Sequence, residues 1–326
     1  MRAVVVEQPG GPEVLHIGES PDPSPSADEV LVRVGATALN RLDLLQRQGV
    51  YPLPPGAPET LGVEMAGEVV SWGADVTGWA TGDRVCALLL GGGYAELVAV
   101  PASMLMRVPD NLTIEQAAAV PEVFLTAYLN LFTLGDLPHD GAALIHGGAS
   151  GVGTAAIQLV KEWGARAIVT VGSATKAARC VALGAAAAFN YNDGPFQESV
   201  LAATAGRGVD VILDMVGAPY WTQNLACLVL GGRLVLVAQQ GGGKLEIELG
   251  AIQRKRLKVI GTGLRPLPLT QKAALTADFA AYALPRFADG RLTPVVDRVY
   301  DWSEAAEAHR YMASNANVGK IVLRVA

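Results

Sequence analysis

A glycine-rich stretch in the middle of the chain has the spacing of a phosphate-binding turn. The stretch is Ala142–Gly153, AALIHGGASGVG, and the segment behind it, Thr154–Gly164, has the apolar spacing of a helix. Gly148, Gly151 and Gly153 lack side chains, so the backbone can approach a phosphate while the helix N-terminus offers free N–H groups. This order of strand, turn and helix predicts a dinucleotide site, although the turn by itself fits a plain strand-to-helix connection equally well.

The end of the next predicted strand indicates which dinucleotide would bind. At this place, about 20 residues beyond the glycines, NAD enzymes carry an acidic residue for the ribose 2′-hydroxyl. Here the chain has Val171, Gly172 and Ser173, so no acid would repel a 2′-phosphate, and Lys176 and Arg179 follow in the next predicted helix. Because cationic side chains pair well with phosphate, the pattern favours NADPH over NADH. The alternative is that Lys176 is only a solvated helix residue.

The elements around the glycine turn alternate between strand and helix from Ala142 to about Thr262. This alternation predicts an α/β fold with a doubly wound, six-stranded parallel Rossmann sheet. The six predicted strands read AALIH, ARAIVTV, AAAFNY, VDVILDMV, GRLVLVA and KVIGT.

The two ends of the chain differ from this middle part. Residues 1 to 100 contain short strand-like runs separated by Gly, Pro and Asp, with a predicted short helix at Asn40–Gln48 and a proline-rich loop at Tyr51–Thr60. Thr113 and Gln116 form a predicted capping box that opens a run of helical spacing. The segment after Gly263 reads as helix, strand, helix and strand, and we expect it to rejoin the first domain. The predicted domains are therefore 1–119 with 263–326, and 120–262.

Composition and charge exclude several classes of function. The chain has 326 residues, of which 51% are hydrophobic and 17% charged, enough for ordered globular domains. Its net charge of −6 gives no basic field for holding nucleic acid or an anionic membrane. No apolar run reaches the length of about 18 residues that a membrane helix needs, and the first residues do not resemble a signal peptide. We expect a cytoplasmic protein without nucleic-acid or membrane partners.

The cysteines and histidines do not form the pattern of a metal site. The three cysteines, Cys86, Cys180 and Cys227, lie far apart, and no CxxC or Cys/His cluster is present. This argues against both a disulfide framework and a zinc site. The four histidines are scattered and are interpreted as surface or packing residues. We expect no bound metal.

Segments along nearly the whole chain resemble the medium-chain dehydrogenase/reductase superfamily. The resemblance is to its zinc-free quinone oxidoreductase branch, which includes zeta-crystallin, and within that branch to the tumour-suppressor-inducible type. The segments that carry the resemblance are QPGGPEVL, ALNRLDLLQRQGVYPLPPG, LGVEMAGEV, GDRVCALLLGGGYAE, QAAAVPEVFLTAY, HGGASGVGTAAIQL, LGAAAAFNY and NVGKIVL. The resemblance implies a strand-rich GroES-like catalytic domain formed by both termini, beside the Rossmann domain.

Departures from the zinc-dependent alcohol dehydrogenases of that superfamily indicate the chemistry. Where those enzymes place a cysteine ligand this chain has Asn40, and where they place a histidine before a glutamate it has Val63 before Glu64. Amide and isopropyl groups do not replace two metal ligands. Without a Lewis acid, the expected acceptors are those that take hydride easily, such as quinones or activated alkenes. Glu64 is then most simply a structural acid.

The resemblance also implies which residues line the cleft between the two domains. Tyr51, Asn40 and Asp43 are the expected catalytic residues, Tyr51 also near the nicotinamide. Tyr51 as a packing aromatic, and Asn40 and Asp43 as cap or turn residues, remain open alternatives. The expected cofactor-binding residues are Tyr51, Thr126, Ser150, Gly151, Val152, Gly172, Ser173, Lys176, Tyr191, Gln240, Leu264 and Asn317.

The sequence therefore predicts direct hydride transfer from NADPH to a quinone, with ortho-quinones preferred. Tyr51, or a water held by Asn40 and Asp43, is expected to stabilise or protonate the developing phenolate. Reduction of an enone, alkenal or enoyl thioester is the enzymatic alternative, and an NADPH-binding redox sensor is the non-enzymatic one. The resemblance further implies a homodimer joined through the cofactor domains, with the strand at Val259–Thr262 as a candidate pairing edge.

Overall fold

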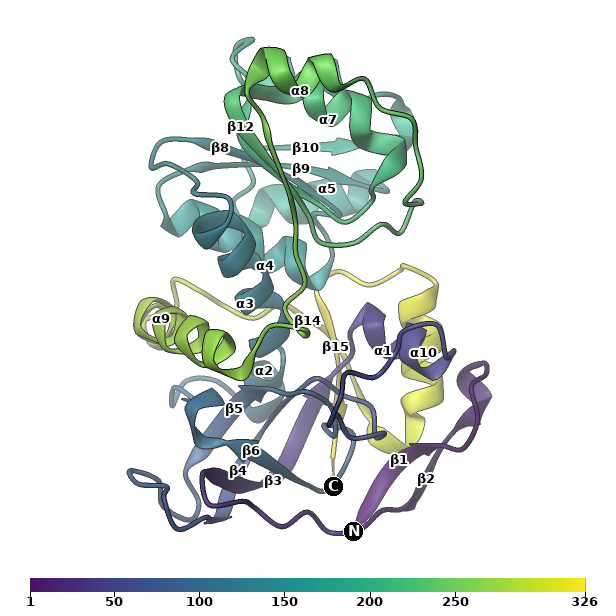
Figure 1. The fold of residues 1–326 in the computed structure, drawn as a ribbon, viewed down its shortest axis with the longest axis vertical. Helices are drawn as coiled ribbons and strands as arrows, with labels where there is room; N and C mark the ends of the chain where they lie inside the picture. The colour runs from purple at the N-terminus through teal and green to yellow at the C-terminus, as the bar shows by residue number, and fades with distance from the viewer. Residues whose placement is uncertain (326) are drawn as a thin grey trace. The chain divides into compact units, whose positions relative to one another are not determined.

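The computed structural model describes residues 1–325 and separates into two compact units (Figure 1). One unit combines Met1–Leu125 with Arg265–Ala326, and the other consists of Thr126–Leu264. The first unit thus contains both ends of the chain, and the second contains the glycine turn.

The unit Thr126–Leu264 is built on a parallel sheet. In the described part of the chain this sheet has six strands in the order β10-β9-β8-β11-β12-β13, and all its neighbours pair in parallel. The predicted doubly wound, six-stranded sheet is confirmed, and the strand order reverses beside β8, where such sheets bind ligands. The strands are β8 (Ala142–His146), β9 (Arg166–Val171), β10 (Ala187–Asn190), β11 (Val209–Asp214), β12 (Leu228–Leu236) and β13 (Lys258–Gly261).

Helices cover both faces of this sheet, α4 and α5 on one side and α7 and α8 on the other (Figure 1). Every residue of β8 is buried, as expected for a central parallel strand enclosed by helices. Phe196 and Val200 pack with strand residues such as Ile212 in the apolar core on one side. The helices are α4 (Gly151–Glu162), α5 (Ala174–Leu183), α6 (Gln197–Ala203), α7 (Trp221–Cys227) and α8 (Leu249–Lys255), with short turns η4 (Tyr191–Asp193) and η5 (Ala218–Tyr220).

The unit that contains both chain ends is built on a mostly antiparallel sheet. Among residues 1–325 its strands run in the order β14-β15-β3-β4-β5-β7, with β6 also paired to β3 and with β1 and β2 in a separate hairpin. Strand β15 lies antiparallel to β3, with Val322 opposite Ala38, so the C-terminal segment completes a sheet begun near the N-terminus. The strands are β1 (Arg2–Val6), β2 (Leu15–Glu19), β3 (Glu29–Ala38), β4 (Glu64–Trp72), β5 (Arg84–Leu88), β6 (Leu97–Pro101), β7 (Leu105–Arg107), β14 (Val296–Asp301) and β15 (Lys320–Arg324).

The run of helical spacing that begins at Thr113 is divided in the structure. The predicted capping box is present, since the Gln116 N–H donates to Thr113 Oγ1 (3.2 Å) and the Thr113 N–H donates to Gln116 Oε1 (3.0 Å). The helix ends before Pro121, which has no N–H to donate and opens the next helix instead. The helices outside the parallel-sheet unit, or leading into it, are α1 (Arg41–Arg47), α2 (Ile114–Ala118), α3 (Pro121–Tyr128), the π-helical η3 (Leu129–Thr133), α9 (Leu269–Ala288) and α10 (Ala305–Ala313), with turns η1 (Pro12–Val14), η2 (Ala102–Met104) and η6 (Trp302–Glu304).

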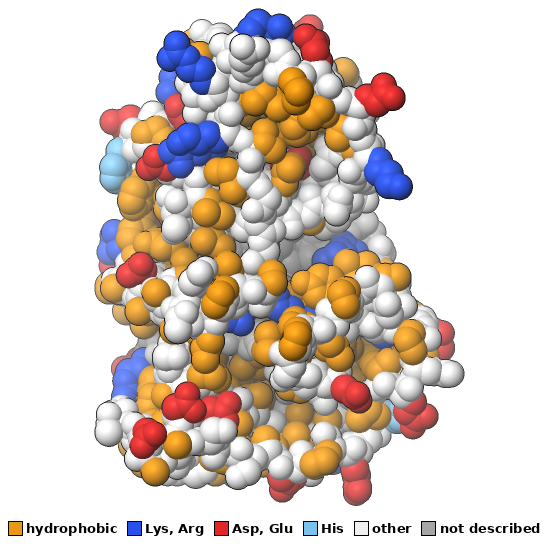
Figure 2. Space-filling model, in the orientation of Figure 1, with side chains coloured by type: hydrophobic (Ala, Val, Ile, Leu, Met, Phe, Trp, Pro, Cys, Tyr) orange, Lys and Arg blue, Asp and Glu red, His pale blue; other side chains and the backbone are white. Residues whose placement is uncertain are grey.

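The surface carries charges of both signs. On the face that Figure 2 shows, basic and acidic side chains are interspersed with apolar and neutral ones, in keeping with the net charge of −6. Within the part of the chain that is described, no helix combines the length and the apolar composition of a membrane span.

We expect Gly153→Ala to destabilise the parallel-sheet unit. A Cβ at this position would lie 2.4 Å from the carbonyl oxygen of Gly147 and 2.5 Å from that of Gly148. Such overpacking costs about 1–3 kcal/mol, which lowers the midpoint of thermal unfolding followed by circular dichroism. Gly261→Ala is the matched control, because a Cβ there meets nothing within 4 Å. Equal midpoints for the two variants would contradict the close approach of turn and helix.

Candidate functional site

The glycine turn joins the end of β8 to the start of α4. Ser150 is the N-cap of α4, and its Oγ accepts a hydrogen bond from the Gly153 N–H (3.0 Å). A Cβ at Gly148 would lie 2.5 Å from the Cβ of Val169, so the turn packs directly against β9. The backbone N–H groups of Gly151 and Val152 belong to the first turn of α4, which has no acidic residue. This helix N-terminus is suited to an anion such as a pyrophosphate.

The end of β9 brings four of the expected cofactor residues together. Ser173 caps α5, its Oγ accepting from the Lys176 N–H (3.2 Å), so Lys176 lies in the first turn of that helix. A Cβ at Gly172 would lie 2.5 Å from the Tyr191 hydroxyl oxygen, which places Tyr191 against the backbone of the strand end. Asn192 Nδ2 donates to the Gly172 carbonyl oxygen (2.9 Å) and fixes the same loop. The strand end therefore offers a cation, hydroxyls and an aromatic ring.

Thr126 and the remaining expected cofactor residues lie on separate segments. The Oγ1 atom of Thr126 on α3 is buried and has no hydrogen-bond partner among residues 1–325. A buried hydroxyl without a partner is unusual in proteins, so Thr126 is a candidate for contact with a bound molecule. Gln240 follows β12 and its N–H donates to the Met215 carbonyl oxygen (3.1 Å), Leu264 is buried after β13, and Asn317 Nδ2 donates to the Gly319 carbonyl oxygen (2.8 Å).

A buried polar network lies beneath the glycine turn. His146, the last residue of β8, is fully buried, with Nδ1 2.8 Å from Thr170 Oγ1 and Nε2 2.8 Å from Asn224 Oδ1. Asn224 Nδ2 donates to Asp214 Oδ2 (3.0 Å), while Asp214 Oδ1 accepts from the Val216 N–H (2.6 Å). Burial lowers the pKa of His146, so a neutral ring links the ends of β8, β9 and β11. The sequence indicates only a surface or packing role for His146, so this network was missed.

In the unit with both chain ends, Asn40 and Asp43 form the start of α1. The Asn40 N–H donates to Asp43 Oδ2 (2.7 Å), and the Gly62 N–H donates to Asp43 Oδ1 (3.3 Å). Burial raises the pKa of Asp43 to about 7, and these hydrogen bonds with the nearby Lys320 oppose the shift. Asp43 is therefore a buried, backbone-bonded carboxyl whose charge changes near neutral pH.

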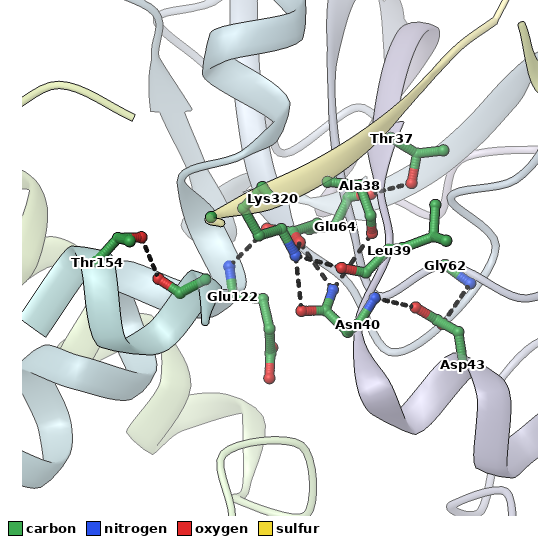
Figure 3. Close-up of polar contacts among 12 residues, drawn as sticks. Thr37, Ala38, Leu39, Asn40, Asp43, Gly62, Glu64, Glu122, Thr154 and Lys320 are labelled. Atoms are coloured by element: carbon green, nitrogen blue, oxygen red, sulfur yellow. Dashed lines mark hydrogen bonds and ion pairs between the residues drawn. The ribbon is translucent and has the colours of Figure 1, made fainter. Parts of the chain in front are cut away.

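Asn40 also connects α1 to a buried ion pair (Figure 3). Lys320 Nζ lies 2.7 Å from Glu64 Oε1, and both side chains are buried. Asn40 Nδ2 donates to the same Glu64 oxygen (2.7 Å), and Asn40 Oδ1 accepts from Lys320 Nζ (2.8 Å). The ion pair with Asn40, which we call the Glu64–Lys320–Asn40 group, joins β4, β15 and α1. Lys320 was not singled out from the sequence, because it is 280 residues from Asn40 along the chain.

Glu122 extends this arrangement from α3. Its backbone N–H donates to Glu64 Oε2 (2.8 Å), while its side chain extends away from the Glu64–Lys320–Asn40 group in Figure 3. The Oε2 atom of Glu122 is buried and has no hydrogen-bond partner in the described part of the chain. Burial raises the pKa of Glu122 to about 8, and the negative charge of Glu64 adds to the shift. The sequence signal for this residue was only its place directly behind the proline that opens α3.

Tyr51, in the proline-rich loop, lies beside a fixed cation. The guanidinium carbon of Arg265 is 5.5 Å from the centroid of the Tyr51 ring, within cation–π range. Arg265 is held by two hydrogen bonds to the Leu90 carbonyl oxygen (3.0 and 2.7 Å) and by one to Gln46 Oε1 (2.9 Å). Burial lowers the pKa of Arg265, and Tyr51, Asp43 and Glu122 oppose the shift. Arg265 thus links the expected residues Tyr51 and Asp43 electrostatically with Glu122.

The donor atoms in this region do not form a metal site. Among residues 1–325, no group of three or more His, Cys, Asp or Glu side chains is arranged to hold a metal ion. Val63 is a buried apolar side chain, and all three cysteines are buried free thiols.

Family models match two parts of the chain. An alcohol dehydrogenase GroES-like domain matches residues 26–110, and a zinc-binding dehydrogenase domain matches residues 183–323. Among solved structures, Escherichia coli quinone oxidoreductase complexed with NADPH has a TM-score of 0.90 at 30% identity, covering 99% of this chain and 100% of that one. An NAD-dependent alcohol dehydrogenase has a TM-score of 0.89 at 33% identity, with 100% of both chains covered.

Curated relatives match over the full length. Quinone oxidoreductase of Salmonella typhimurium is 33% identical over 316 residues, covering 96% of both chains. That of Rattus norvegicus is 30% identical over 326 residues, covering 99% of this chain and 97% of the relative. A phenolphthiocerol/phthiocerol polyketide synthase protein of Mycobacterium tuberculosis is 31% identical over 98% of this chain, which spans 14% of that longer protein. Full-length similarity together with the shared two-domain fold shows that this chain belongs to the quinone oxidoreductase family of the medium-chain dehydrogenases/reductases.

Proposed function

We propose that this chain is an NADPH-dependent reductase that transfers a hydride to a quinone, with ortho-quinones as the preferred class. The observation that carries the proposal is full-length similarity to quinone oxidoreductases combined with an acid-free end of β9 that presents Lys176. The coenzyme preference rests on Lys176, because an ammonium group pairs with a 2′-phosphate and offers nothing specific to a 2′-hydroxyl.

The residues of the parallel-sheet unit fit the proposed coenzyme. The helix N-terminus at Gly151 and Val152 suits the pyrophosphate, and the missing Cβ of Gly148 lets the turn before this helix pack against Val169 of β9. The partnerless hydroxyl of Thr126 suits a polar group of the nicotinamide. When bound, NADPH supplies the hydride. We propose further coenzyme contacts from the remaining expected residues Tyr51, Ser150, Gly172, Ser173, Tyr191, Gln240, Leu264 and Asn317.

We propose that the acceptor binds beside Tyr51. The Tyr51 hydroxyl would donate a hydrogen bond to the quinone oxygen on which negative charge develops, and the cation of Arg265 next to its ring would favour that charge. We propose that Asn40 and Asp43 position the neighbouring residues and do not contact the acceptor. The Asn40 amide holds Lys320 and Glu64, and Asp43 fixes the start of α1, so both position the acceptor side of the site.

We also propose that the reaction does not need zinc. The support is the chemistry of the donor set: Asn40 uses its amide oxygen and nitrogen on Lys320 and Glu64, and Val63 has no donor atom. Positive charge at the acceptor would come from Lys320 and Arg265.

For assembly and location we propose a cytoplasmic homodimer. Several large apolar side chains are exposed on β12 and β13, in the loop before α8 and at the first residue of α8, among them Leu230, Val259, Ile247 and Leu249. An uncovered strand edge such as β13 is a place where a second copy would pair. Three buried free thiols suit a reducing compartment.

Reduction of an activated alkene is the second candidate. The similarity to one part of a polyketide synthase protein favours this candidate. A hydride placed to reduce a quinone can also be transferred to a polarised carbon–carbon double bond. A steady-state comparison of NADPH and NADH with ortho-quinones, para-quinones and enones separates the candidates. We expect NADPH with ortho-quinones to give the highest kcat/KM. A higher kcat/KM with enones would favour the second candidate, and tight NADPH binding without turnover would favour a redox sensor.

We expect Lys176→Ala to raise the KM for NADPH roughly 10- to 100-fold, the equivalent of one charge-assisted hydrogen bond. The KM for NADH should change little, because NADH has no 2′-phosphate. Lys161→Ala removes a charge from the other end of the neighbouring helix α4 and serves as the control. Equal effects of Lys176→Ala on both coenzymes would show that Lys176 does not recognise the phosphate.

We expect Tyr51→Phe to lower kcat for an ortho-quinone at saturating NADPH by at least about tenfold, because the hydrogen bond to the developing oxyanion is lost. Tyr311→Phe is the matched control, since its hydroxyl donates to Asp297 outside the proposed site (2.8 Å). If Tyr51→Phe turns over as fast as the wild type, Tyr51 has only a packing role.

A further inference from the structure

Glu64 and Glu122 are joined by a hydrogen bond from the Glu122 N–H to the Glu64 carboxylate, but the side chains of the two residues differ in their partners. Glu64 accepts from Lys320, from the Asn40 amide and from the Glu122 N–H, so its carboxylate is matched by three donors, one of them a cation. The Glu122 carboxyl has a buried Oε2 with no partner among the described residues. Glu64 is thus the partner of a cation, whereas the surroundings of Glu122 favour its protonated form.

The groups that face Glu122 explain why it keeps a proton. Burial raises its pKa to about 8, the charges of Glu64 and Asp43 contribute to the rise, and Lys320 and Arg265 oppose the shift. Below pH 8 most molecules therefore carry a neutral Glu122 carboxyl with one O–H to donate. The charged or titratable side chains around Glu122 are Asp43 of α1, Glu64 of β4, Lys320 of β15, Lys272 of α9, and Arg265 in the segment before α9.

The position of Glu122 connects it with the acceptor side of the site. Its backbone is fixed by the hydrogen bond to Glu64 (2.8 Å), and its carboxyl interacts with Arg265, the same cation that lies 5.5 Å from the Tyr51 ring. Asp43, the other carboxyl with a raised pKa, accepts a backbone N–H bond on each of its oxygens, which fixes its orientation at the start of α1. Of these two carboxyl groups, Glu122 has the oxygen without a partner among the described residues, and it shares the nearby cation Arg265 with Tyr51.

We propose that Glu122 is the catalytic acid that protonates the reduced acceptor. The inference rests on the proposed hydride transfer, which delivers two electrons and one hydrogen to the quinone and leaves a hydroquinone anion. The O–H bond of the Glu122 carboxyl then breaks, the proton forms the new O–H bond of the hydroquinone, and the carboxylate regains a proton from water. Overall, quinone, NADPH and one proton give hydroquinone and NADP⁺. Tyr51 stabilises the developing charge and Glu122 supplies the proton.

The kinetic test compares Glu122→Gln with the wild type at saturating NADPH and ortho-quinone. Glutamine keeps the shape of the side chain and has no acidic proton, so kcat should fall at least about tenfold. In the wild type kcat should decline as pH rises through about 8, and this decline should be absent from Glu122→Gln. Glu122→Asp, which keeps the acid with a shorter reach, should recover part of kcat together with the decline. The control is Glu115→Gln, which loses an exposed ion pair to Arg324 and should keep the wild-type kcat.

A second measurement needs no turnover. From about pH 4.5 to 8 the folded protein keeps the Glu122 proton that the unfolded chain releases, so the wild type loses stability with rising pH. Glu122→Gln lacks this contribution. Its thermal unfolding midpoint should therefore rise relative to the wild type between pH 5 and pH 8, while Glu115→Gln should show no such trend.

The outcomes separate this inference from the proposed function. An active wild type whose kcat and pH profile are unchanged by Glu122→Gln overturns the role of Glu122 and leaves the proposed function intact. A constant difference in midpoint across this pH range also overturns it, because Glu122 would then hold no proton to give. A wild type that consumes no NADPH with any quinone or enone overturns the proposed function and this inference with it.

Discussion

The buried ion pair between Lys320 and Glu64 is the interaction on which the polar centre of the unit with both chain ends depends. Removing both charges from water is costly, and the attraction between them offsets this only when the remaining polar atoms also find partners. Asn40 and the Glu122 N–H provide those partners, so strands β4 and β15 and helices α1 and α3 meet at one carboxylate. Loss of one member would leave an uncompensated buried charge, which costs about 3–5 kcal/mol.

The parallel-sheet unit also contains buried polar side chains, and there hydrogen bonds satisfy them without an ion pair. His146 is neutral, and Thr170 and Asn224 satisfy its two ring nitrogens, so the chain of hydrogen bonds ends on Asp214. Asp214 in turn holds backbone N–H groups of the loop behind β11. The ends of three strands are thereby fixed around the glycine turn by hydrogen bonds to a neutral histidine, whereas Asp43 and Glu122 in the other unit change charge near neutral pH.

The local features that the sequence predicted are determined by near neighbours in the chain. The strand, glycine turn and helix at Ala142–Gly153, and the capping box of Thr113 and Gln116, depend on residues within one or two turns. Glu122 and Lys320 were missed because their neighbours come from strands and helices far apart in the sequence. The spacing of residues along the chain does not predict contacts of this kind. The roles of the expected site residues stay predictions, because side-chain identity does not determine what a ligand contacts.

The charges around Glu122 also account for the direction of proton transfer. Burial pushes Asp43 and Glu122 toward their neutral forms, so these two carboxyl groups offset the positive charge of Arg265 only in part. The set therefore favours an anion that develops on a bound acceptor. Proton donation removes that anion and creates a carboxylate on Glu122 in its place. Burial and Glu64 disfavour this carboxylate, so Glu122 takes up a new proton from water below pH 8. The environment that keeps Glu122 protonated before the reaction therefore also favours its protonation after each turnover.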